Sequence, residues 1–155
     1  MSPFAPIGLP FPWELWIAAR LLPLFVRNRP LHDILKLANP TGSSPGRDPM
    51  PADAIVRAVK RAAARPWLMR HRRCLREGLL GFHYLSREGY RPLLHFGIIP
   101  ESLASARPKA HCWISLDGTI ILNPPEVPML DLFTYDGSRS APATRAHGRL
   151  EPMNG

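Results

Sequence analysis

Residues 72–99, RRCLREGLLGFHYLSREGYRPLLHFGII, contain a helical pattern that begins at a cysteine, ends at a glycine and is followed by an extended run. From Cys74 to Glu88 apolar residues recur at helical spacing, which predicts one buried face. Gly89 supplies a left-handed cap, and Pro92 to Ile99 is rich in branched and aromatic residues typical of a strand. The stretch predicts a helix followed by a strand, with Cys74 at or near the helix N-terminus.

Residues 110–127, AHCWISLDGTIILNPPEV, predict a β-hairpin that turns at Leu-Asp-Gly. With a three-residue loop, 116–118, His111 faces Asn123, and directly opposed side chains lie about 5 Å apart. With a two-residue loop Asn123 pairs with Cys112 instead and points away from His111. Because neighbouring strand residues point to opposite faces, Cys112 is predicted to be a core residue outside any site that contains His111.

Cys74 has the surroundings that a nucleophilic thiol needs. A thiolate is favoured by positive charge, by a helix N-terminus and by a nearby base. The basic neighbours of Cys74 in the sequence are Arg70, His71, Arg72, Arg73 and Arg76. His111 is the best candidate for the base, ahead of His95 and His83, and Asn123 is the predicted third member that orients it. The competing interpretation is that Cys74 is an inert core cysteine.

The chain has 155 residues, which suits one domain with a single active site. We predict a helical N-terminal extension and loop at 1–51, a catalytic domain at 52–136 and a disordered tail at 137–155. Within the extension, 31–38 is a predicted helix and 39–51 a loop rich in proline, glycine and serine. A further helix starts at Ala52 and stops at Pro66, so the expected fold class is α+β, with helices before a small antiparallel sheet.

The sequence also limits where the protein works. The two cysteines make no disulfide framework and no secretion signal is evident, so a cytoplasmic protein is expected. The apolar segment 9–26 is interrupted by Glu14 and Arg20 and is too short to span a bilayer. Its tryptophans and flanking arginines suit peripheral contact with a membrane, and the alternative is a helix that caps the core or meets a partner protein.

Together these stretches resemble the protease domain of the lasso peptide biosynthesis B protein family, which has a transglutaminase-like fold. The resemblance covers roughly 52–136 and rests on Cys-Leu at a helix start, a helix that ends at glycine, a strand, and His-x-Trp before Asp-Gly. It implies a cysteine peptidase that removes the leader from a ribosomally made precursor peptide before macrocyclisation. The family cysteine corresponds to Cys74 and the family histidine to His111.

The resemblance further implies partners and exposes two departures. The partners are the precursor's leader peptide, a separate leader-recognition protein, because no such module is evident in this chain, and the lasso cyclase. Where the family usually has aspartate this chain has Asn123, which orients an imidazole but cannot neutralise an imidazolium, so Asp131 is the alternative third member. Cys112 replaces the small alanine usual between the histidine and the tryptophan.

Three other functions remain open from the sequence. The net charge of +8 suits a basic binding module or an inactive scaffold, although no nucleic-acid fold signature is present and no nucleic-acid partner is expected. A zinc site at His71, Cys74, His111 and Cys112 is disfavoured, because the last two point to opposite faces. Acyl transfer to an amine on the same fold is equally compatible with the sequence. No cofactor and no metal are expected.

Overall fold

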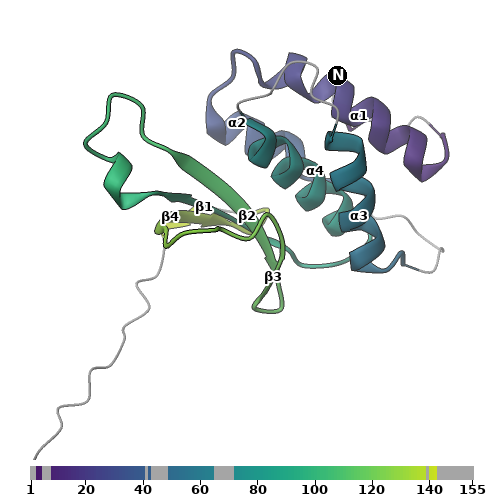
Figure 1. The fold of residues 1–155 in the computed structure, drawn as a ribbon. Helices are drawn as coiled ribbons and strands as arrows, with labels where there is room; N and C mark the ends of the chain where they lie inside the picture. Colours follow the sequence, from purple (N-terminus) through teal and green to yellow (C-terminus); the bar gives the residue numbers. More distant parts are fainter. Residues whose placement is uncertain are drawn as a thin grey trace, which may run out of the picture.

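The structure, a computed structural model, describes residues 3–4, 8–40, 42, 49–64, 72–138 and 140–142. Within these ranges four α-helices precede an antiparallel sheet, and the helices gather on one side of it (Figure 1). The helices are α1 (Phe11–Val26), α2 (Leu31–Ala38), α3 (Ala52–Ala63) and α4 (Arg73–Arg87). The predicted α+β fold class, with the cysteine-bearing helix against a small antiparallel sheet, is confirmed.

Prolines mark the starts of three helices. Pro10, Pro30 and Pro51 directly precede α1, α2 and α3. Proline has no N–H group, and the first N–H groups of a helix have no partner inside it, so proline costs little at these positions. Part of the high proline content, 19 residues, therefore delimits helices.

The sheet has strand order β3-β2-β1-β4-β5. Its strands are β1 (Leu93–Ile98), β2 (Ala110–Leu116), β3 (Thr119–Leu122), β4 (Leu130–Tyr135) and β5 (Ser140–Pro142), and a short 3₁₀ helix η2 (Pro100–Ser102) follows β1. The sequence predicted the first three strands. The prediction of a disordered tail from 137 is wrong for 140–142, which pair with β4, and residues 139 and 143–155 lie outside the described residues.

The hairpin between β2 and β3 closes with a two-residue turn. Asp117 and Gly118 both have positive φ, 50° and 80°, as a type I′ turn requires. Leu116 therefore pairs directly with Thr119. The predicted three-residue loop is wrong, because an Asp-Gly pair fits the tighter turn.

A bulge moves the register of this hairpin once more. Beyond the bulge Ile114 faces Leu122, and β3 ends there. Asn123 thus follows the strand and has a left-handed backbone with φ 55°. The predicted strand pair between His111 and Asn123 does not form.

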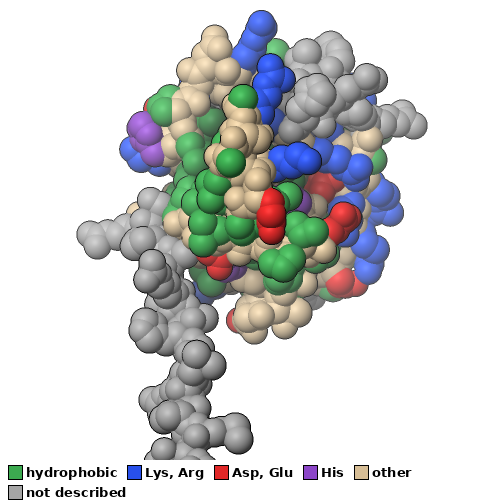
Figure 2. Space-filling model, turned by 60° about the vertical axis from the view of Figure 1, so that its left-hand side comes forward, with side chains coloured by type: hydrophobic (Ala, Val, Ile, Leu, Met, Phe, Trp, Pro, Cys, Tyr) green, Lys and Arg blue, Asp and Glu red, His purple; other side chains and the backbone are tan. Residues whose placement is uncertain are grey.

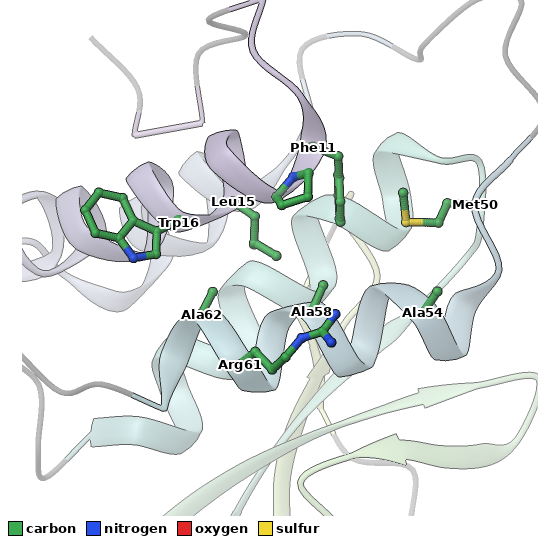
Figure 3. Close-up of a pocket in the computed structure, with 9 residues that line it drawn as sticks. Phe11, Leu15, Trp16, Met50, Ala54, Ala58, Arg61 and Ala62 are labelled. Carbon is green, nitrogen blue, oxygen red and sulfur yellow. The ribbon is translucent and has the colours of Figure 1, made fainter.

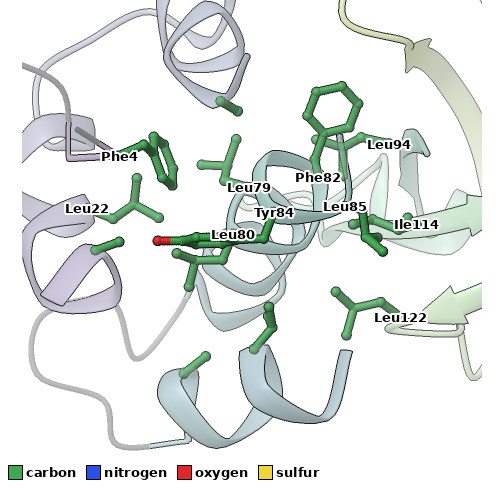
Figure 4. Packing of buried hydrophobic residues seen from close by; sticks show 14 of the residues in the cluster. Phe4, Leu22, Leu79, Leu80, Phe82, Tyr84, Leu85, Leu94, Ile114 and Leu122 are labelled. Atoms are coloured by element: carbon green, nitrogen blue, oxygen red, sulfur yellow. The ribbon is translucent and has the colours of Figure 1, made fainter. Parts of the chain in front are cut away.

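Helix α4 is the centre of the core, with α1, α2 and α3 on one side and β2 on the other (Figure 4). On its sheet side Gly78 and Gly81 let the backbone approach closely. A Cβ on Gly81 would lie 2.7 Å from Leu122 Cδ2 and 2.8 Å from Ile114 Cδ1. The two glycines therefore set the spacing between the helix and the sheet.

An ion pair joins the N-terminal helix to α4. The Arg87 guanidinium donates to the carboxylate of Glu14, and both side chains are largely buried. Arg87 also lies over the Tyr84 ring, 4.7 Å from its centroid. Helix α1 is thus part of the same packed unit as α4.

Candidate active site

Cys74 is the second residue of α4 and is half-buried. Its pKa is lowered to about 5, and the largest cause is a hydrogen bond with the Cys112 thiol. Burial opposes this effect, while the Cys112 main chain and His111, through its charge and a hydrogen bond, add to it. Cys74 is therefore predominantly thiolate at neutral pH, the form that a nucleophile requires.

Cys112 corrects one expectation from the sequence. Its side chain points toward α4, where Sγ lies 3.2 Å from the position of a Cβ on Gly78, one helical turn after Cys74. The Cys112 side chain is buried, with 2% exposed, and its own pKa is raised by the hydrogen bond with Cys74 and by burial. Cys112 is a core residue, as predicted, but the prediction that it lies outside the site is wrong.

His111 is the second residue of β2 and reaches the same site from the sheet. Its Nε2 atom lies 3.0 Å from the main-chain oxygen of Asn123. Because a carbonyl oxygen only accepts hydrogen bonds, Nε2 carries a proton and Nδ1 is left to accept one. The geometry selects the tautomer that a general base needs.

Asn123 contributes in a different way from the one predicted. Its main-chain oxygen, and not its side chain, holds His111. The side-chain amide instead donates to the main-chain oxygen of Cys74 at 3.3 Å. The left-handed backbone at Asn123, which asparagine adopts more readily than most residues, directs these two groups to different elements. Asn123 therefore connects the two candidate catalytic residues.

Asp131 lies away from His111. Gly97 pairs with His111 on one side and with Asp131 on the other, so two strand spacings, roughly 10 Å, separate them. The charge of Asp131 acts on His95, whose pKa is lowered by burial and raised in part by this carboxylate. The structure thus places Asp131 beside another histidine.

An aromatic column supports the imidazole of His111. The Trp113 ring stacks on it with a centroid distance of 6.3 Å, and His95 stacks on Trp113 at 5.4 Å. Both ring nitrogens of His95 have a hydrogen-bond partner: Nε2 lies 2.7 Å from Ser115 Oγ, and Nδ1 lies 3.1 Å from Thr134 Oγ1. The three rings thus form one stacked row that ends at His111.

Two of the arginines that the sequence places around Cys74 have other partners. Arg73 pairs with Glu77, Nε to Oε1 2.7 Å, and Arg76 is buried and donates to the Ala63 carbonyl. Neither is among the causes of the lowered Cys74 pKa. Arg70 and His71 lie outside the described residues. In Figure 2 most Lys and Arg side chains lie along the upper and right-hand part of the view, next to the hydrophobic side chains at its centre and left.

Among the described residues, no group of three or more His, Cys, Asp or Glu side chains is placed to hold a metal ion. The zinc alternative also requires His71, which is outside those residues. A search of the described helices for one that is long and apolar enough to cross a membrane finds none.

The comparisons with known proteins give one match. The family model described as the transglutaminase-like superfamily matches residues 16–134, which include α1 as well as the sheet. No similar curated protein and no similar solved structure was found.

Proposed function

Because the chain belongs to the transglutaminase-like superfamily, we propose that it is a thiol enzyme in which Cys74 is the nucleophile and His111 the general base. The superfamily suggests cysteine peptidase or acyltransferase chemistry. Within it we propose a peptidase that removes the leader from a lasso-type precursor peptide. This finer assignment rests on the resemblance of residues 72–99 and 110–127 to the lasso peptide biosynthesis B protein family.

One observation carries the proposal. The Cys74 thiol is partly accessible and has a low pKa, and it lies beside His111, whose tautomer is fixed by a hydrogen bond. The Cys74 pKa of about 5 leaves the thiolate dominant at pH 7. The bond from His111 Nε2 to Asn123 leaves Nδ1 as the proton acceptor. A structural core cysteine needs neither arrangement, so both support the catalytic reading.

The proposed reaction has two stages. The Cys74 thiolate attacks the carbonyl carbon at the leader junction, and the carbonyl oxygen takes the negative charge. Main-chain N–H groups at the start of a helix lack partners within the helix, so those at the start of α4 are suited to stabilise that oxyanion. His111 holds on Nδ1 the proton that the Cys74 thiol gave up when it became a thiolate. It passes this proton to the leaving amine, which releases the core peptide and leaves a thioester on Cys74.

Water completes the turnover. His111 takes a proton from the water as it attacks the thioester, and the leader leaves with a free carboxylate while the thiol returns to its starting state. An amine in place of water gives acyl transfer by the same steps. We place the leader-recognition step on a separate protein and the subsequent ring closure on a cyclase, and the basic net charge of +8 suits an acidic peptide or partner.

The test is incubation of the purified protein with candidate precursor peptides encoded near its gene, with and without any neighbouring leader-binding protein. Product masses are followed for the native chain and for Cys74→Ala. Loss of the leader that disappears in Cys74→Ala supports the peptidase. Addition of a small amine separates hydrolysis from acyl transfer, because an amide product then appears in place of the acid. A folded protein that cuts no precursor under any combination refutes the peptidase and favours the scaffold.

A further inference from the structure

Helix α1 exposes apolar side chains on the side that faces away from the core. We call Trp13, Trp16, Ile17, Arg20, Leu21 and Leu24 the outer face of α1, since helical spacing places them on one stripe. Trp13 is 62% exposed, Leu24 56% and Trp16 42%. The opposite face of α1 is buried against α3 and α4. A helix that is apolar on both faces requires a second apolar environment.

The charged side chains on the outer face and directly after it are arginines. The Arg20 guanidinium lies over the Trp16 ring, 4.3 Å from its centroid. Arg27 and Arg29 are exposed directly after the helix. The carboxylate of α1, Glu14, is turned inward to Arg87. The outer face therefore combines apolar rings with cations and presents no carboxylate of its own helix.

A groove continues this apolar surface between α1 and α3. It has a volume of about 360 Å³. Phe11, Leu15 and Trp16 of α1 face Ala58 and Ala62 of α3 across it, with Arg61 beside them (Figure 3). Trp16 belongs both to the groove and to the outer face, so the two form one apolar area with arginines at its border.

We propose that the outer face of α1 binds an anionic membrane surface, with the helix lying in the plane of the interface. Tryptophan favours the boundary between headgroups and acyl chains, where its ring is in an apolar environment and its N–H reaches water. Arg20, Arg27 and Arg29 are placed to contact lipid phosphates. The 16 residues of α1 fit a helix that lies on the bilayer.

The arrangement of the fold agrees with this orientation. Helices α3 and α4 lie between α1 and the sheet that carries His111 (Figure 1). A membrane on the α1 side therefore leaves the sheet side in water. A second copy of the chain is a poorer occupant, because a two-fold contact through this face brings the arginines of the two copies together.

The test is flotation of the full chain with vesicles of phosphatidylcholine and phosphatidylglycerol, compared with phosphatidylcholine alone. We expect binding to the anionic vesicles that weakens as salt is raised. The double variant Trp13→Ala/Trp16→Ala is expected to bind about tenfold more weakly or not at all. Arg27→Glu/Arg29→Glu is expected to lose the preference for anionic lipid.

A matched control uses apolar side chains on the sheet side. Leu130 and Leu132 are 48% and 47% exposed on β4, so Leu130→Ser/Leu132→Ser removes exposed apolar side chains elsewhere and is expected to leave vesicle binding unchanged. Circular dichroism melting confirms that each variant is folded. Absence of vesicle binding by the native chain overturns the proposal, as does equal binding by the tryptophan variant. Self-association that the tryptophan variant abolishes, without vesicle binding, assigns the face to a second copy.

Discussion

The Nε2 atom of His111 lies 3.0 Å from the main-chain oxygen of Asn123. The Asn123 side-chain amide in turn donates to the main-chain oxygen of Cys74. The proposed base and nucleophile are thus held to the same residue by different groups. The histidine needs only a carbonyl there, so no carboxylate is required to select its tautomer.

Asn123→Asp is expected to reduce kcat/KM about tenfold or more, although it restores the residue usual in the resembling family. A carboxylate cannot donate to the Cys74 carbonyl and is repelled by it. Asn123→Gly is the matched control, because glycine keeps the left-handed backbone and the oxygen that holds His111. We expect a smaller loss for glycine than for aspartate. Higher activity in Asn123→Asp than in the native chain contradicts this account.

The alkylation rate of Cys74 by iodoacetamide is expected to have its midpoint near pH 5 and to fall below it, because the protonated thiol does not react. Both Cys112→Ala and His111→Ala should move the midpoint upward. The shift should be larger for Cys112→Ala, since the hydrogen bond with Cys112 is the largest cause of the low pKa. Mass spectrometry gives the rate and should find Cys112 unmodified. A native midpoint near 8.5, the ordinary cysteine value, rejects the assignment.

Gly81→Ala is expected to destabilise the fold by about 1–3 kcal/mol, because its Cβ meets Leu122 and Ile114 below 3 Å. Urea unfolding measures the change. Gly42→Ala is the control, since no atom lies within 4 Å of its Cβ and it is exposed. An equal effect of the two substitutions removes the packing explanation.

The folded protein is expected to lose stability as the pH falls from about 6.5 to 4. Burial lowers the pKa of His83 to about 4, so in this range the unfolded chain binds a proton that the folded chain does not. The full loss is about 3 kcal/mol. His83→Phe should be less stable at pH 7, because it leaves the Ala38 carbonyl without its 3.1 Å partner, but should show a flatter pH dependence. If the free energy of unfolding depends on pH equally steeply in the native chain and in His83→Phe, His83 is excluded as the source of the loss.

Glu14→Gln is expected to destabilise the protein by about 3 kcal/mol, since it leaves the buried Arg87 charge without its partner. Glu14→Leu/Arg87→Met should recover much of the loss.

A chain that begins at residue 52 lacks Glu14 and should fail to fold, because the buried Arg87 charge again has no partner. The domain proposed at 52–136 therefore requires its helical extension. Cooperative thermal unfolding of that truncated chain contradicts this prediction.

The sequence predicts the helices and the first strands well because their signals are local. Helical periodicity and Gly89 place α4, and branched residues place β2 and β3. The sequence does not predict strand β4, because its exposed leucines at 130 and 132 follow a proline-rich segment and give no clear alternation with a polar face. Strand β5 has only three residues, 140–142, which form a strand by pairing with β4 and carry no local signal of their own.

The candidate site is predictable in its residues but not in its contacts. The start of α4 and strand β2 bring Cys74 and His111 together, as the sequence indicates. The contact of Asn123 depends on a two-residue turn and a bulge, and an error of one residue in register reverses every side chain. The position of Cys112 follows from the face of β2 that meets α4, which alternation alone does not identify.

The glycine pair on α4 also bears on the candidate active site. A larger residue at position 78 or 81 pushes β2 and β3 outward, and His111 and Asn123 move with them, away from Cys74. The two glycines, four and seven residues after Cys74, therefore tie the packing of the core to the distance between the proposed nucleophile and its base.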